Sequence, residues 1–192
     1  MAIISSATTI ADNGAFSVNL GSLIFISEQT TTGAGTVTFT GLSSAYPIYK
    51  FEFLNCRPHT SYGDLMFDAS TNGSTWNNQA KTTSFFSAIN PHGIEYGAGS
   101  DAAQVNGRVN LTDNTGGGST QGASGTMFVY SPSSTTFVKH IQAHLNSYEA
   151  STSINTFTSG YINSTSAITA FRFSFRDHNL VGTIKLYGIK DS

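Results

Sequence analysis

Two histidines, His140 and His144, have the H-x-x-x-H spacing of a zinc-protease motif. That motif needs a glutamate directly after the first histidine as general base, but this chain has Ile141 there. If the segment is a strand, the two imidazoles share a face and stand about 13 Å apart, too far to bind one ion together. We therefore predict no metal site and interpret both histidines as polar residues on a sheet face.

The acidic residues form no catalytic pair that the sequence can indicate. Asp64 and Asp68 would lie on one strand face about 13 Å apart, which is wider than either glycosidase geometry. Residues 68 to 73 imitate the start of a calcium loop, yet Gln79 stands where the bidentate carboxylate belongs. Because Asn72 and Gly73 both tolerate positive φ, this stretch predicts a hairpin turn instead.

Other motifs for nucleophiles and nucleotides are equally incomplete. The glycine run 116 to 118 is followed by Ser119 and Thr120 but by no lysine that could reach a phosphate. The sequence has no G-x-S-x-G nucleophile elbow. We predict no enzymatic activity, no cofactor and no metal.

The composition is that of a folded, turn-rich β protein. The 192 residues, enough for one domain with a sizeable core, include 14 Phe and 8 Tyr, but only 10% of them are charged. A net charge of −2 without a basic cluster argues against nucleic acid. No stretch approaches the roughly 20 apolar residues that span a bilayer, so we expect no membrane partner. The start lacks a basic, apolar leader pattern, and we expect synthesis and folding in a cytoplasm.

Period-2 alternation of apolar and polar residues recurs along the chain and predicts about a dozen short strands. The expected ranges are 15 to 20, 22 to 28, 35 to 41, 46 to 55, 64 to 70, 81 to 88, 103 to 111, 125 to 131, 136 to 145, 155 to 162, 167 to 177 and 181 to 190. This spacing favours an all-β fold, an antiparallel, jelly-roll-like β-sandwich. We expect residues 1 to 192 to form a single domain, with 1 to 14 as a candidate N-terminal arm.

Two strands indicate which faces are buried, and one segment is ambiguous. Tyr49, Phe51 and Phe53 share one strand face, and the phenylalanines of 171 to 175 share another, so both faces should pack between two sheets. Segment 136 to 145 also has a helical stripe, but its β-branched start favours a strand. Cys56, the only cysteine, follows a strand pattern and is interpreted as structural.

Candidate contact residues lie in the first residues and in predicted loops. Loops on a rigid sandwich are where recognition concentrates, and aromatic side chains there could stack against sugar rings. For each aromatic candidate, local packing is the competing explanation. The candidates are Met1, Ala2, Ile3, Ile4, Tyr62, Trp76 and Tyr96.

Four segments, in order, resemble a family of tailed-phage virion structural proteins that is common in phages of marine and freshwater bacteria, including cyanophages. The segments are "AYPIYKFEFLNCRPHTSYGDLMFDASTNGSTWN" (45 to 77), "GTMFVYSPSSTTFVKHI" (125 to 141), "GYINSTSAITAFRFSF" (160 to 175) and "GTIKLYGIK" (182 to 190). The sequence departs from the family at Cys56 and Arg57, where small or apolar residues would be expected before Pro58.

The resemblance implies a non-enzymatic β-sandwich component of the virion. One expectation is a capsid decoration (cement) protein that binds and stabilises the major capsid protein shell and contacts neighbouring virion proteins or further copies of itself. The other is a tail or fibre module that binds a host receptor or surface glycan. Both place the protein in the virion, assembled in the host cytoplasm.

Overall fold

The computed structural model describes residues 23–90 and 102–190 in full and gives only strand assignments for parts of 1–22 and 91–101. The described residues contain no helix, and fourteen strands lie in the two full ranges. These are β4 (Leu23–Ala34), β5 (Val37–Thr40), β6 (Ile48–Pro58), β7 (Tyr62–Gly63), β8 (Leu65–Ser70), β9 (Lys81–Asn90), β11 (Ala102–Val105), β12 (Val109–Asn110), β13 (Thr115–Gly116), β14 (Gly122–Tyr130), β15 (Lys139–Glu149), β16 (Thr152–Ile162), β17 (Ala170–Phe175) and β18 (Leu180–Ile189). The others are β1 (Ile3–Ser5), β2 (Thr8–Asp12), β3 (Ala15–Phe16) and β10 (Gly93–Glu95).

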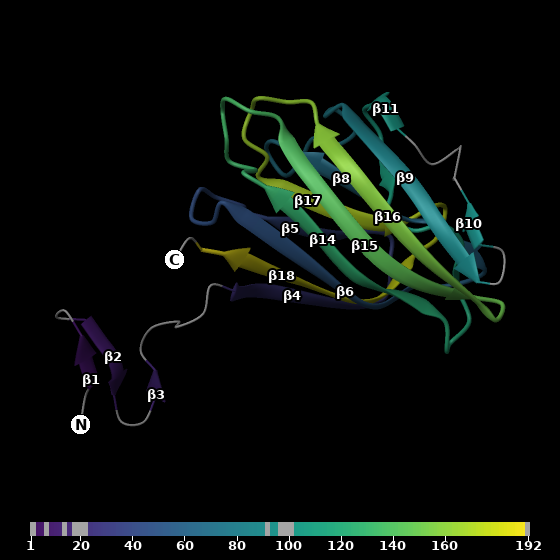
Figure 1. The fold of residues 1–192 in the computed structure, drawn as a ribbon, viewed down its shortest axis with the longest axis horizontal. Helices are drawn as coiled ribbons and strands as arrows, with labels where there is room; N and C mark the ends of the chain where they lie inside the picture. Colours follow the sequence, from purple (N-terminus) through teal and green to yellow (C-terminus); the bar gives the residue numbers. More distant parts are fainter. Residues whose placement is uncertain are drawn as a thin grey trace.

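Two antiparallel sheets pack face to face (Figure 1). The large sheet has the order β10-β9-β16-β15-β14-β6-β18-β4, with β11 also on β9, and the small sheet has the order β12-β8-β17-β5. Two short sheets, β1-β2-β3 and β13-β7, complete the assignment. The expected all-β antiparallel sandwich is confirmed, whereas the jelly-roll connectivity stays a prediction.

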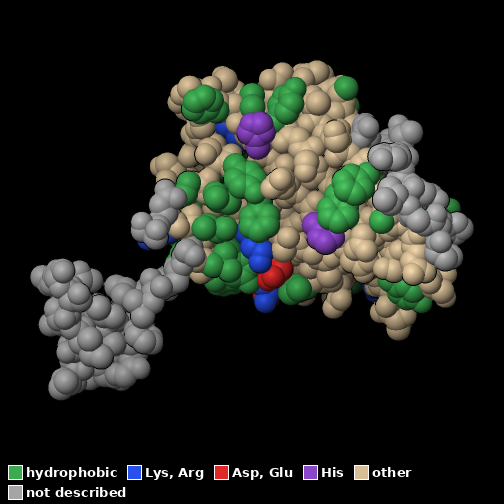
Figure 2. Space-filling view, viewed as in Figure 1, with side chains coloured by type: hydrophobic (Ala, Val, Ile, Leu, Met, Phe, Trp, Pro, Cys, Tyr) green, Lys and Arg blue, Asp and Glu red, His purple; other side chains and the backbone are tan. Residues whose placement is uncertain are grey.

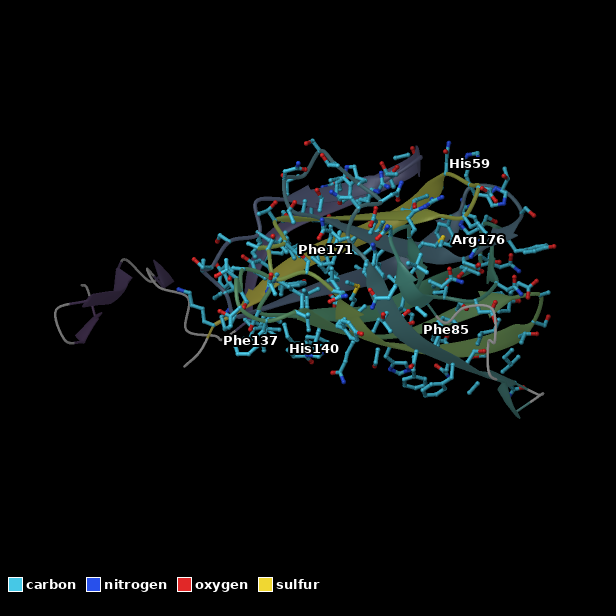
Figure 3. All side chains as sticks on the ribbon, turned by 90° about the horizontal axis from the view of Figure 1, so that it is seen from above. His59, Phe85, Phe137, His140, Phe171 and Arg176 are labelled. Atoms are coloured by element: carbon cyan, nitrogen blue, oxygen red, sulfur yellow. The ribbon has the colours of Figure 1, made fainter. Side chains whose placement is uncertain are left out.

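The core is a layer of phenylalanine rings between the sheets. Phe173 of the small sheet lies 4.9 Å from the ring of Phe51 and 5.1 Å from that of Phe53, both edge to face. Phe171 contacts Phe51 at 5.5 Å, and Phe39 of β5 also meets Phe51 at 5.5 Å. Edge-to-face pairs of buried rings gain about 0.5–1.5 kcal/mol each beyond their area. The two faces predicted to be buried are therefore the two halves of the core (Figure 3, Phe171).

Strand β15 settles the ambiguous segment in favour of a strand. From Lys139 to Tyr148 its side chains alternate strictly between buried and exposed, and it pairs with β14 on one side and β16 on the other. The aliphatic residues Ile141 and Leu145 enter the core, while His140 and His144 point outward. A helix would have placed Phe137 on the apolar stripe, but its side chain is 70% exposed.

A β-bulge in β6 lets that strand stay in the core along its whole length. Between Phe53 and Cys56, β6 has one residue more than both neighbouring strands, and Asn55 takes up the excess with a φ of 50°. The Asn55 N–H donates to Ser124 Oγ instead of to a strand carbonyl. The extra residue shifts the alternation of inward and outward side chains by one position. Cys56 and Pro58 therefore point inward, whereas in a regular strand Asn55, two residues after Phe53, would have done so.

The hairpin expected at Asn72 and Gly73 is wrong, although the turn itself exists. The Asn72 side chain accepts from the N–H groups of Ser74 and Thr75, and Gly73 has a φ of 75°. However, β8 pairs with β12 and β17 in the small sheet, while β9 pairs with β16 in the large one. Residues 71–80 therefore cross from one sheet to the other.

The single strand expected at 103 to 111 is also wrong, for a related reason. Strand β11 pairs with β9 in the large sheet and β12 pairs with β8 in the small one, so the chain crosses between sheets a second time within this range. Gln104, with a φ of 53°, begins that change of direction. The side chains expected to form an N-terminal arm, residues 1 to 14, lie outside the fully described residues.

We expect that a chain truncated after Val181 will not fold to a soluble state. Strand β18 is hydrogen-bonded to β6 and to β4 along its length, and it places Ile184 and Leu186 in the core. Without it β4 loses its partner in the large sheet. The test is soluble yield and urea unfolding beside the full chain; a soluble truncated chain that unfolds cooperatively would contradict it.

We also expect the Cys56 thiol to be inert in the folded protein. Burial raises its pKa to about 12 from the ordinary value of 9.0. A thiol that ionises near pH 9 when unfolded but near pH 12 when folded favours folding below pH 9, and this contribution is lost as the pH rises from 9 to 12. Ellman's reagent should react only after unfolding, and Cys56→Ala should unfold with a weaker alkaline dependence than the wild type. Rapid labelling of the native thiol would refute this.

Candidate functional site

A buried charged cluster lies where both crossing segments meet. Lys81 Nζ is 2.8 Å from Asp68 Oδ1, and both side chains are fully buried. The same ammonium donates to the carbonyl oxygens of Gln79, in the first crossing, and of Asn106, in the second. Burial lowers the pKa of Lys81, and the Asp68 carboxylate opposes this shift. Lys81 therefore ties the small sheet to the two segments that leave it.

The second Asp68 oxygen is also fully engaged. Asp68 Oδ2 accepts from Arg172 at 3.1 Å and from the Asn77 N–H at 2.9 Å. The Arg172 guanidinium in turn lies 4.7 Å from the ring of Trp76. The predicted recognition residue Trp76 is thus half-buried against an arginine of the small sheet, as the packing explanation would have it.

Asp64 and Asp68 bind different cations. Asp64 binds the Arg176 guanidinium at 3.0 Å and accepts from Asn110, while Asp68 is held by Lys81. Each carboxylate already has its own cation. Within residues 23–90 and 102–190, no three acidic, histidine or cysteine side chains gather in a way that would hold a metal ion. In the same residues no helix is long and apolar enough to cross a membrane.

The outer face of the large sheet, which points away from the core, carries a row of stacked rings. On β15, His144 stacks on Phe157 of β16 with 4.2 Å between ring centroids and an angle of 8°. Phe157 stacks in turn on Phe86 of β9 at 4.8 Å and 15°. Three strands thus present a row of parallel rings to solvent; histidine and hydrophobic side chains lie together on this face (Figure 2).

We use the name outer groove for two adjoining depressions beside this row. The first, of about 230 Å³, includes Phe128, His144 and Phe157, and the second, of about 350 Å³, includes Tyr130, His140 and Tyr161. Gln142 and Ser159 belong to both. His140 points away from the core side of the sheet in Figure 3.

Farther along β14 and β15 lies a larger hollow of about 930 Å³, here called the polar hollow. Thr30, Thr183, Ser124 and Asn146 contribute hydroxyl and amide groups from four different strands. The hollow lies over the β6 bulge, because Asn55 and Ser124 line it together. Bulges are enriched beside functional sites, where they bend a strand and redirect its side chains.

Of the sequence-predicted contact residues, the two that the structure describes in full, Tyr62 and Trp76, do not line the outer groove. Tyr62 is 59% exposed beside the glycine loop at Gly117, away from the outer groove. Tyr96 lies outside the described residues, as do Met1 and Ala2, and no side-chain position is described for Ile3 or Ile4 of β1. The rings of the outer groove stand on β14, β15 and β16 and not in loops. The alternation of side chains along these three strands is the sequence signal that could have indicated their outward positions.

Comparison with models of protein families, with curated proteins and with solved structures finds no match for this chain. The site must therefore be interpreted from its own geometry.

We expect Lys81→Met to lower the free energy of unfolding by roughly 3–5 kcal/mol, because it leaves Asp68 buried without its closest cation. The matched control is Lys185→Met, since Lys185 pairs with Glu28 at 3.5 Å near the surface and such pairs contribute about 1 kcal/mol or less. Urea unfolding measures both. Equal losses for the two variants would show that the buried pair has no special role.

Proposed function

We propose that the protein is a non-enzymatic structural component of a tailed-phage virion, namely a capsid decoration protein that binds the major capsid protein shell. The proposal joins the resemblance of the four sequence segments to one structural observation, the exposed apolar end of edge strand β4. Its place would be the virion, assembled in the host cytoplasm.

Strand β4 carries the proposal because it is a long edge strand with apolar side chains in solvent. It stands last in the large sheet and pairs only with β18 among the described strands. Leu23, Phe25 and Ile26 are 46%, 57% and 39% exposed. Proteins usually protect such an edge with charges or short strands, because its free N–H and C=O groups pair readily with another chain.

A bulge explains why successive residues of this edge are exposed. Phe25 pairs with Tyr187 and Ser27 with Leu186, so Ile26 is an extra residue. The bulge turns Phe25 and Ile26 to solvent together, and the Phe25 ring packs edge to face on Tyr187 at 5.7 Å. This arrangement supports docking of the β4 edge, by strand pairing and apolar contact, onto a neighbouring virion protein or a further copy of this chain.

A tail or fibre module that binds host surface glycan is the second candidate. The observation in its favour is the outer groove, where aromatic rings alternate with amide and hydroxyl groups. The two functions use different parts of the large sheet, so one does not exclude the other.

We expect the double variant Phe25→Asp, Ile26→Asp to bind shells of the major capsid protein at least about tenfold more weakly than the wild type, because it buries charge in the contact. The assay is cosedimentation with shells depleted of this protein. Tyr62→Asp, an equally exposed aromatic elsewhere, is the matched control and should bind normally.

Immunogold labelling of intact particles gives an independent test of location. Labels on heads are expected for a decoration protein. Labels confined to tails would reject the capsid function and leave the second candidate in place.

A further inference from the structure

We propose that the outer groove is a binding site for an uncharged oligosaccharide chain that lies along β14 and β15. The inference rests on the second candidate function, the recognition of a glycan, and it names the site and the ligand class. It does not depend on whether the chain occupies the head or the tail.

The rings of the outer groove provide apolar surfaces at both ends. His144 and Phe157, stacked at 4.2 Å, border the first depression opposite Phe128. His140 and Tyr161, in edge contact at 6.3 Å, border the second with Tyr130. Flat rings that are partly exposed in a depression suit the apolar faces of sugar rings, because aromatic side chains add area at little cost in conformational entropy.

Polar groups lie between the two sets of rings. The Tyr130 hydroxyl donates to Gln142 Oε1 at 2.8 Å, which orients the Gln142 amide. The Gln142 amide nitrogen has no acceptor among the described residues, so its two hydrogens are available to a ligand hydroxyl. Ser159 adds a hydroxyl in the same position, between both depressions. A few placed polar groups among apolar surfaces are typical of sites that orient a small ligand.

The uncharged lining of the outer groove disfavours charged polymers. Among the residues that the structure describes, no lysine, arginine, aspartate or glutamate lines either depression. Lys50, which stands opposite Phe128 on β6, is already paired with Glu52 at 3.4 Å. Single-stranded nucleic acid also stacks on rings, but it needs a positive channel for its phosphates. In the outer groove an acidic polysaccharide would meet the same lack of cations. Arg57, which lines the polar hollow, already donates to the carbonyl oxygens of Pro58 and Gly117, so a neutral chain is the ligand that remains.

The length of the track suits a chain better than a single sugar. The outward residues of β14 and β15 run from Ser124 and Asn146 at the polar hollow to Tyr130 and His140 at the far end. Six residues of strand span roughly 20 Å. The hydroxyl and amide groups of the polar hollow continue the track, so a polymer can be held by rings at one end and by hydrogen bonds at the other.

The test is affinity electrophoresis of the full chain in gels that contain dextran, a neutral bacterial polysaccharide, laminarin, a neutral algal one, or alginate, an acidic one. We expect dextran or laminarin to slow the protein and alginate to have no effect, and the one that works indicates a bacterial or an algal source. Phe157→Ala and Tyr130→Ala should each weaken the retardation about tenfold, as loss of a stacked ring implies.

Phe137→Ala is the matched control, because Phe137 is the same residue type, is 70% exposed and lies outside the outer groove. Thermal melts establish that each variant is folded. Retardation by alginate alone, retardation by neither neutral polymer, or an equal loss in the control would overturn the proposal. So would self-association that Tyr130→Ala abolishes in sedimentation, since a second copy would then occupy this face. Capsid cosedimentation of the same variants should be normal, which separates this result from that of the β4 edge.

Discussion

The arrangement of the two sheets depends on the contacts of the buried Lys81 ammonium. The chain leaves the small sheet at Ser70, enters the large sheet at Lys81 and returns to the small sheet at Val109. Lys81 Nζ contacts Asp68 of the small sheet and a carbonyl in each crossing segment, at Gln79 and Asn106. A fully buried cation is costly unless all its donors are satisfied, and here its three donors have three acceptors. Lys139 is also buried and donates to the carbonyls of Phe137 and Ser164, so both buried lysines connect loops at the margin of the core.

The strands were predictable from the sequence because a strand with one face in the core has an apolar residue at every second position. The phenylalanines of β6 and β17 alternate with polar residues, and their buried faces meet as expected. The connections were not predictable to the same degree. Asn72-Gly73 indicates a turn but not which sheet the next strand joins. The crossing is held by Asp68, which binds the Asn77 N–H and Lys81 of that segment and also Arg172, which is distant in sequence. The residues around Asn72-Gly73 do not indicate a contact that forms only after both sheets assemble.

The candidate site shows the same division between local and long-range information. The outward positions of His140 and His144 follow from alternation, and the absence of a shared metal ligand set follows from their spacing on a strand. That His144 stacks on Phe157 and Phe86 depends on the register of three strands, which the sequence does not state. Trp76 was predicted as a contact residue in a loop, but its ring packs against Arg172. Rigid strands hold ring spacing more closely than loops do, which favours the sheet face as a place for recognition.

The arrangement of side chains on the large sheet allows assembly and recognition to act together. Between the outer groove on β14 and the exposed end of β4 lie β6 and β18. Lys50 and Glu52 of β6 form one outward ion pair, and Lys185 of β18 forms another with Glu28 of β4. The Tyr187 hydroxyl donates to Glu52 at 3.2 Å, and these side chains together make a polar band. Three strand spacings separate β14 from β4, roughly 14 Å. The charges of this polar band are already paired with one another, so we expect neither contact to include them. A partner on the β4 edge can therefore leave the outer groove open to solvent.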